Sequence, residues 1–160
     1  DVAIEFHSCS KTFNMTGDRI GFAVGNEKLI DGLVKVKSQI DSGPPPYIQK
    51  VAVKALESYN GDEPPEYMQR VNQIYRERRD ILVKGLNSIG LKCKKSKGTF
   101  YVWADCGFDS MAFTLKMLDV GVVAAPGVGF GKYGATCIRF SLTRPNEEIE
   151  DACERMQKIS

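Results

Sequence analysis

Residues 8–21 are Ser8-Cys9-Ser10-Lys11-Thr12-Phe13-Asn14-Met15-Thr16-Gly17-Asp18-Arg19-Ile20-Gly21, and this stretch gives the strongest indication of both fold and chemistry in the chain. It places a lysine amine, two serine hydroxyls and an arginine guanidinium close together in the sequence. Hydroxyls and a guanidinium bind phosphate through strong, directional hydrogen bonds. We therefore expect Ser8, Ser10 and Arg19 to hold a phosphate beside Lys11.

The amine of Lys11 suggests covalent chemistry at the same place. A lysine amine forms a Schiff base with a carbonyl compound, and pyridoxal phosphate (PLP) supplies both a carbonyl and a phosphate. Taken alone, a lysine in a loop rich in Ser, Thr and Gly is more often only solvated. The neighbouring hydroxyls and the Arg19 guanidinium favour a catalytic role for Lys11.

The composition excludes several classes of function. The 160 residues are 42% hydrophobic and 26% charged, which is typical of a folded globular chain. A net charge of +2 is too small to attract nucleic acid. No apolar run approaches the roughly 20 residues that a membrane-spanning helix needs. We therefore expect neither nucleic acid nor a membrane as a partner.

The cysteines argue against a metal site or a disulfide framework. The chain has five cysteines at wide, irregular spacing, with no C-x-x-C pair, and one histidine, His7. Such spacing does not match zinc ligands or the disulfide pattern of a small secreted domain. We expect no bound metal, and reduced thiols in a cytoplasmic protein.

The beginning of the sequence is unusual for a translated protein. The chain opens at Asp1 and has no methionine before Met15. Val2, Ile4 and Phe6 alternate with other residues, as in a strand. We interpret residue 1 as a position inside a larger protein, just before or inside a strand.

Hydrophobic periodicity predicts alternating strands and helices, which favours α/β or α+β packing. The charged face of the longest helix, which includes Arg78 and Arg79, is interpreted as solvated surface. The expected strands cover residues 2–6, 19–24, 91–93, 99–104, 122–124 and 137–142. The expected helices cover residues 26–40, with Asn26 as N-cap, and 47–59, 66–88, 111–119 and 146–159.

The pattern Ser-x-Ser-Lys-x-x-x-Met-x-Gly-x-Arg-x-Gly in residues 8–21 resembles the PLP attachment motif of class I/II aminotransferases, the fold-type I PLP enzymes. The resemblance implies that Lys11 forms the Schiff base with the cofactor and later moves a proton at the substrate Cα. It also implies that Ser8 and Arg19 bind the cofactor phosphate, with Ser10 as a helper.

The resemblance extends along the chain. Residues 38–43 and Gln49 are similar to LL-diaminopimelate aminotransferase-like members, and Gly98–Trp103 is similar to the family's G-x-F-Y strand. Residues 126–142 resemble the segment that ends in the arginine binding the substrate α-carboxylate, which is Arg139 here. A guanidinium suits this role because it pairs with a carboxylate through two hydrogen bonds.

The resemblance also implies an architecture and partners. Residues 1–62 correspond to the end of the large PLP-binding domain, 63–88 to a connecting helix and 89–160 to the small α+β domain. This is the C-terminal part of the PLP-dependent transferase fold. The implied partners are an amino acid, a 2-oxo acid and, in the full-length parent, a second subunit of a homodimer.

The same resemblance indicates what residues 1–160 lack. The family's ring-binding acid, stacking aromatic residue and glycine-rich turn lie upstream of the lysine, and residues 1–10 offer only Asp1 and Glu5 as acids. We therefore expect the isolated chain to be inactive.

Two other functions remain compatible with the motif. A PLP-dependent C–S lyase of the same fold carries the same lysine loop, and an aminotransferase-like domain can serve as a non-catalytic ligand sensor. A nucleotide site is not favoured, although residues 129–134 spell G-x-G-x-x-G, because a strand rather than a helix is expected after them.

Overall fold

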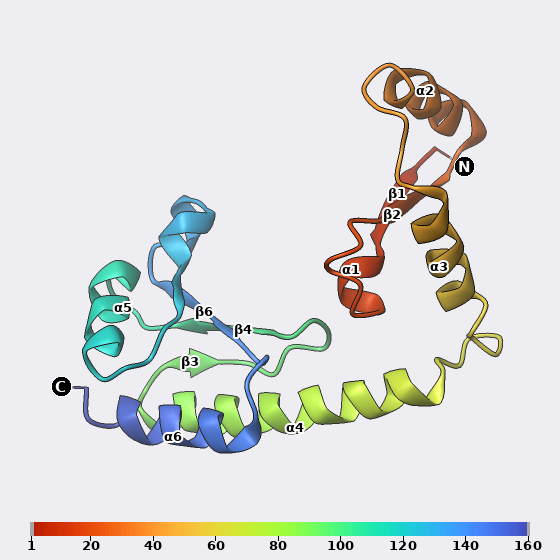
Figure 1. The fold of residues 1–160 in the computed structure, drawn as a ribbon. Helices are drawn as coiled ribbons and strands as arrows, with labels where there is room; N and C mark the ends of the chain where they lie inside the picture. Colours follow the sequence, from red (N-terminus) through yellow and green to blue (C-terminus); the bar gives the residue numbers. More distant parts are fainter. Residues whose placement is uncertain (1, 160) are drawn as a thin grey trace. The chain divides into compact units, whose positions relative to one another are not determined.

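The computed structural model describes residues 2–159, which form two compact units (Figure 1). Unit 1 extends to Gln69, and unit 2 begins at Arg70. The boundary between them falls within the long helix α4 (Glu66–Ser88). Each unit has its own sheet and its own hydrophobic core.

Unit 1 is built around a two-stranded antiparallel ribbon whose register runs from Ile4 opposite Gly25 to Ser8 opposite Gly21. The expected strands and helices of this region are present with small shifts of their ends. Asn26 caps the second helix, since its side-chain oxygen accepts the N–H groups of Lys28 at 3.1 Å and Leu29 at 3.4 Å. The elements are β1 (Ile4–Ser8), α1 (Cys9–Thr12), β2 (Gly21–Gly25), α2 (Glu27–Lys37) and α3 (Pro46–Leu56).

Unit 2 is built around a four-stranded antiparallel sheet with strand order β3-β4-β6-β5. Besides most of α4, its helices are α5 (Ser110–Asp119) and α6 (Asn146–Met156), with two short 3-10 helices, η1 (Gly127–Phe130) and η2 (Lys132–Gly134). The strands are β3 (Lys92–Cys93), β4 (Tyr101–Asp105), β5 (Ala125–Pro126) and β6 (Cys137–Ser141).

The two long strands, β4 and β6, have one face packed in the core and an outer face on the other side. Val102 and Ala104 of β4 and Ile138 and Phe140 of β6 are buried in the core. The alternate residues point the other way, so that Trp103 lies opposite Arg139 on the outer face. This alternation is what presents Arg139 outside the core.

Two predictions for unit 2 are wrong. The strand expected at residues 122–124 lies instead at 125–126, because the hydrogen-bonded turn that follows α5 reaches Val122, whose N–H donates to the Met117 carbonyl at 2.9 Å. Arg78 and Arg79 are not simply solvated. Their Nη1 groups donate to the carbonyls of Leu142 at 3.1 Å and Ser96 at 2.9 Å, and so connect α4 to distant loops.

Helices α4 and α6 approach each other closely at Gly85. A Cβ atom at this position would lie 2.3 Å from Sγ of Cys153 and 2.8 Å from its Cβ. Both distances are shorter than any normal contact, so a side chain at Gly85 would force the helices apart.

We expect Gly85→Val to lower the free energy of unfolding by about 2 kcal/mol, as overpacking of a core does. The matched control is Lys84→Val, which introduces the same side chain at the adjacent, exposed position of α4 and is expected to change stability by no more than about 0.5 kcal/mol. Urea unfolding of both variants provides the measurement. Equal free energies of unfolding for Gly85→Val and Lys84→Val would contradict the close packing of α6 at Gly85.

Candidate functional site

Buried apolar side chains anchor the loop of residues 8–20 to the core of unit 1. Cys9, Phe13 and Met15 are buried and form a small core with Ala52 of α3 and Met68 of α4. The two ends of the loop are joined by a hydrogen bond from the Cys9 N–H to the Ile20 carbonyl at 3.2 Å. Burial also raises the pKa of the Cys9 thiol, so this cysteine has a packing role.

Three polar residues of the same loop, Ser8, Lys11 and Arg19, are exposed. Lys11 is exposed on α1, whose first turn is capped by the Ser8 hydroxyl, which accepts the Ser10 N–H at 3.2 Å. A serine hydroxyl that accepts a hydrogen bond still has its own proton to donate. Ser8 is exposed, whereas Ser10 is 8% exposed.

Arg19 is held in an unusual backbone conformation at the end of the loop. Its φ of 52° lies in the left-handed region, which side-chain-bearing residues seldom adopt. Its Nη1 donates to the Thr16 carbonyl at 3.0 Å, and the Thr16 hydroxyl donates to the Ser10 carbonyl at 3.0 Å. Asn14 is also left-handed, with a φ of 57°. Backbone strain of this kind is concentrated at functional sites.

Thr16 is therefore a residue of this site that sequence reasoning missed. It connects the arginine to the serine through one carbonyl and one hydroxyl. Its place between Gly17 and the buried Met15 gave no signal, since a threonine in a polar loop is ordinarily only solvated.

The structure brings four of the predicted residues together in one loop of unit 1: Ser8, Ser10, Lys11 and Arg19. The group supplies an amine, two hydroxyls and a guanidinium, which are the donors that a phosphorylated carbonyl compound requires. The donor set thus fits a phosphate next to a reactive amine.

The fifth predicted residue, Arg139, belongs to β6 of unit 2. It is half-buried, and its Cζ lies 4.3 Å from the centre of the Tyr101 ring and 4.5 Å from that of Phe130. Within residues 2–159, no hydrogen bond or ion pair engages the Arg139 guanidinium. Its N–H groups are thus available to an oxyanion from solution.

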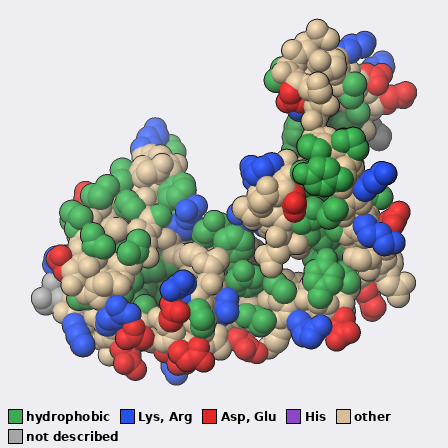
Figure 2. Space-filling view, viewed as in Figure 1, with side chains coloured by type: hydrophobic (Ala, Val, Ile, Leu, Met, Phe, Trp, Pro, Cys, Tyr) green, Lys and Arg blue, Asp and Glu red, His purple; other side chains and the backbone are tan. Residues whose placement is uncertain are grey.

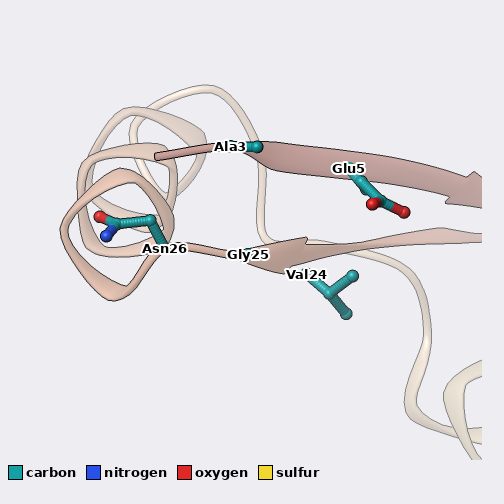
Figure 3. A pocket seen from close by; sticks show the side chains of 5 residues that line it. All are labelled: Ala3, Glu5, Val24, Gly25 and Asn26. Atoms are coloured by element: carbon teal, nitrogen blue, oxygen red, sulfur yellow. The ribbon is translucent and has the colours of Figure 1, made fainter. Parts of the chain in front are cut away.

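Two other features of unit 1 do not add to the site. A hollow at the far end of the ribbon is lined by Ala3, Glu5, Val24, Gly25 and Asn26, and only Glu5 among these is ionisable (Figure 3). The Glu5 carboxylate is 3.2 Å from Nε2 of His7, whose ring stacks on Phe22. Of the two acids noted near the start of the chain, Asp1 lies outside the described residues.

Residues 2–159 show neither a membrane span nor a metal site. None of the helices in this range is both long and apolar enough to cross a membrane. The same range contains no group of three or more His, Cys, Asp or Glu side chains placed to bind a metal ion. The five cysteines, all of which fall in it, are free thiols.

Comparison with known sequences extends over nearly the whole chain. The family model described as aminotransferase class I and II matches residues 1–156. The LL-diaminopimelate aminotransferase of Aquifex aeolicus is 44% identical over 162 residues, covering 99% of this chain and 41% of the relative. LL-diaminopimelate aminotransferase 2 of Trichormus variabilis is 49% identical over 160 residues, covering 98% of this chain and 40% of the relative. The chain therefore spans about two fifths of the length of these relatives.

Solved structures give the same result for the fold. A probable N-succinyldiaminopimelate aminotransferase from Thermus thermophilus superposes with a TM-score of 0.89 at 33% identity, over 98% of this chain and 42% of that one. An aromatic aminotransferase from Pyrococcus horikoshii superposes with a TM-score of 0.87 at 34% identity, over 98% of this chain and 42% of that one. The predicted fold class, the C-terminal part of the fold-type I transferase fold, is confirmed. The chain belongs to the class I and II aminotransferase family.

Proposed function

We propose that the full-length protein containing this chain transfers an amino group between an amino acid and a 2-oxo acid, with PLP as its cofactor. The observation that carries the proposal is the loop of residues 8–20, in which the Ser8 hydroxyl, the Lys11 amine and the Arg19 guanidinium are exposed, while Ser10 is nearly buried. Membership of the aminotransferase family supports the same reaction.

The residues of the loop would have two roles, binding of the cofactor phosphate and covalent attachment of the cofactor. Ser8 and Arg19, with Ser10 as a helper, would hold the cofactor phosphate, and Lys11 would be the covalent attachment point. When bound, PLP supplies an electron sink that stabilises negative charge at the substrate Cα. The Lys11 amine would take the proton from the substrate Cα and deliver it to the cofactor carbon that receives the amino group, and it would move a proton in the opposite direction when the 2-oxo acid is aminated.

Arg139 would bind the α-carboxylate that all α-amino acid substrates share. A guanidinium offers two parallel N–H groups to the two carboxylate oxygens, which fixes the orientation of the substrate as well as its position. The absence, within residues 2–159, of any acceptor bonded to this guanidinium supports the assignment.

The donor amino acid follows from the relatives rather than from the site. LL-diaminopimelate is the first donor to assay, because relatives 44–49% identical carry it in their names. We further propose that the full-length enzyme is a cytoplasmic homodimer. Residues 1–62 would form the end of its large domain and residues 89–160 its small domain, with residues 63–88 as the helix that connects the two domains. The division of the chain into two units within α4 supports a border in that helix.

The proposal is tested by an amino-transfer assay on the full-length protein and on the isolated 160-residue chain. With PLP, LL-diaminopimelate and 2-oxoglutarate, we expect the full-length protein to form glutamate. The isolated chain is expected to form none, because the parts that bind the cofactor ring are implied to lie upstream. Release of pyruvate and ammonia from a sulfur-containing amino acid, without oxo-acid exchange, would identify a C–S lyase instead. Glutamate formation by the isolated chain would contradict the second expectation.

A further inference from the structure

The guanidinium of Arg139 is flanked by two aromatic rings, and this arrangement has a consequence for substrate binding. The Tyr101 ring comes from the neighbouring strand β4 and the Phe130 ring from η1. Their centres lie 4.3 Å and 4.5 Å from Cζ of the arginine. We propose that Tyr101 and Phe130 are positioning residues, which fix the guanidinium and leave its N–H groups to a substrate carboxylate. The inference rests on the carboxylate-binding role proposed for Arg139.

The Tyr101 ring is supported by further aromatic contacts. Its centre lies 4.6 Å from that of Phe100, and the Phe100 ring stacks on Tyr75 of α4 with centres 5.7 Å apart. Tyr101 lies opposite Ser141, two residues from Arg139 on the same strand, so both side chains are on the outer face. The tyrosine ring is thus a fixed surface against which the arginine rests.

The Phe130 ring is held by the loop that carries it. The backbone segments at Gly127 and Gly134 approach so closely that a Cβ at Gly134 would lie 2.2 Å from the Gly127 carbonyl oxygen. A Cβ at Gly127 would lie 2.4 Å from the Gly134 oxygen. The Phe130 ring also meets Trp103 edge-on, with centres 5.6 Å apart. The glycines therefore allow the tight loop that brings Phe130 over Arg139.

Two of the rings near Arg139 lie largely outside the core of unit 2. Phe130 is 55% exposed and Trp103 is 42% exposed. Hydrophobic side chains are visible on the outer surface of this unit, among polar ones (Figure 2). Phe130 and Trp103 are therefore not part of the packed core, whose buried residues of β4 and β6 lie on the other face of these strands.

An aromatic face and a carboxylate hold a guanidinium in different ways. A structural carboxylate beside Arg139 would occupy the N–H groups and compete with the substrate. An aromatic ring attracts the cation through its face and uses none of the in-plane hydrogen-bond donors. The rings also restrict a long side chain before the substrate arrives, which reduces the entropy lost on binding.

The test compares three variants of the full-length protein with PLP. Phe130→Leu removes the ring but keeps an apolar side chain at an exposed position, and Phe130→Tyr keeps the ring. Phe108→Leu is the matched control, because Phe108 is a 51% exposed ring that contacts Phe113 and not the arginine. We expect Phe130→Leu to raise the KM for the amino acid about fivefold, with kcat within about twofold, as the loss of one cation–π contact predicts.

Phe130→Tyr and Phe108→Leu are expected to keep the wild-type KM. An unchanged KM in Phe130→Leu, or a fall in kcat alone, would overturn the positioning role. If the wild-type protein transferred no amino group to any 2-oxo acid, the proposed reaction would fail instead.

A second measurement decides the positioning role without turnover. Acetate can be titrated into the full-length protein, without an amino acid, while the NMR signal of the Arg139 Nε–H group is followed. The signal is expected to respond to acetate, with an affinity about fivefold lower in Phe130→Leu, as the same contact predicts. Equal acetate affinities in the full-length wild-type protein and in Phe130→Leu would overturn the inference even if the enzyme transaminates.

Discussion

Replacing Lys11 with alanine in the full-length protein is expected to lower kcat for amino transfer by about 10³-fold or more. The change removes both the covalent attachment point and the group that moves the Cα proton, and proton transfer alone is worth roughly 10²–10⁴-fold. Because Lys11 is exposed, its loss should leave the stability of the chain nearly unchanged. Thermal unfolding of the variant checks that the effect is chemical.

Lys11→Arg provides a sharper version of the same prediction. It keeps the positive charge and much of the length, but a guanidinium stays protonated and cannot act as a nucleophile or a base. We expect it to be as inactive as Lys11→Ala. The control is Lys28→Ala, which removes an exposed lysine of α2 and should retain full activity. A Lys11→Arg enzyme with more than a tenth of the wild-type rate would contradict the assigned role.

Arg139→Lys is expected to have the second largest effect. The lysine keeps the charge but loses the two parallel donors and the flat surface that contacts Tyr101 and Phe130. We expect kcat/KM to fall about 10²-fold, which corresponds to about 3 kcal/mol of lost substrate binding. The loss should be similar for every α-amino acid tested, because the carboxylate is common to all of them.

The matched control for this prediction is Arg144→Lys. Arg144 is an exposed arginine of the same unit, and its Nε is 2.6 Å from a Glu148 carboxylate oxygen on α6. Its replacement should leave kcat/KM within about twofold, since surface ion pairs contribute little. Similar losses in both variants would mean that arginines of unit 2 act through folding rather than through substrate binding.

The sequence was sufficient where local pattern determines structure. The Asn26 cap, the strand at residues 101–105 and the helical periodicity of α4 all depend on neighbours within a few residues. The motif in residues 8–21 is also local, which is why its polar residues could be named before the loop was seen. The assignment of roles to those residues stays a prediction.

The features that the sequence did not reveal depend on residues far apart in the chain. The Arg78 side chain binds the carbonyl of Leu142, 64 positions away, and Gly85 matters only because Cys153 packs against it. The rings around Arg139 come from β4 and from a glycine-rich turn, and no periodicity connects them. Lys95, on the far side of the turn after α4, also reaches Asp80 and, with the neighbouring Arg79, holds the pKa of the Asp80 carboxyl below its usual range.

The central claim is that Lys11 is the lysine that carries PLP, and peptide mapping tests it most directly. The full-length protein is incubated with PLP, the covalent link is reduced with borohydride, and the digested peptides are analysed by mass spectrometry. The account predicts that the phosphopyridoxyl group is found on Lys11, and that Lys11→Ala loses both this label and the visible absorbance of the bound cofactor. A label on Lys28 or Lys50, or one spread evenly over the exposed lysines, would contradict it.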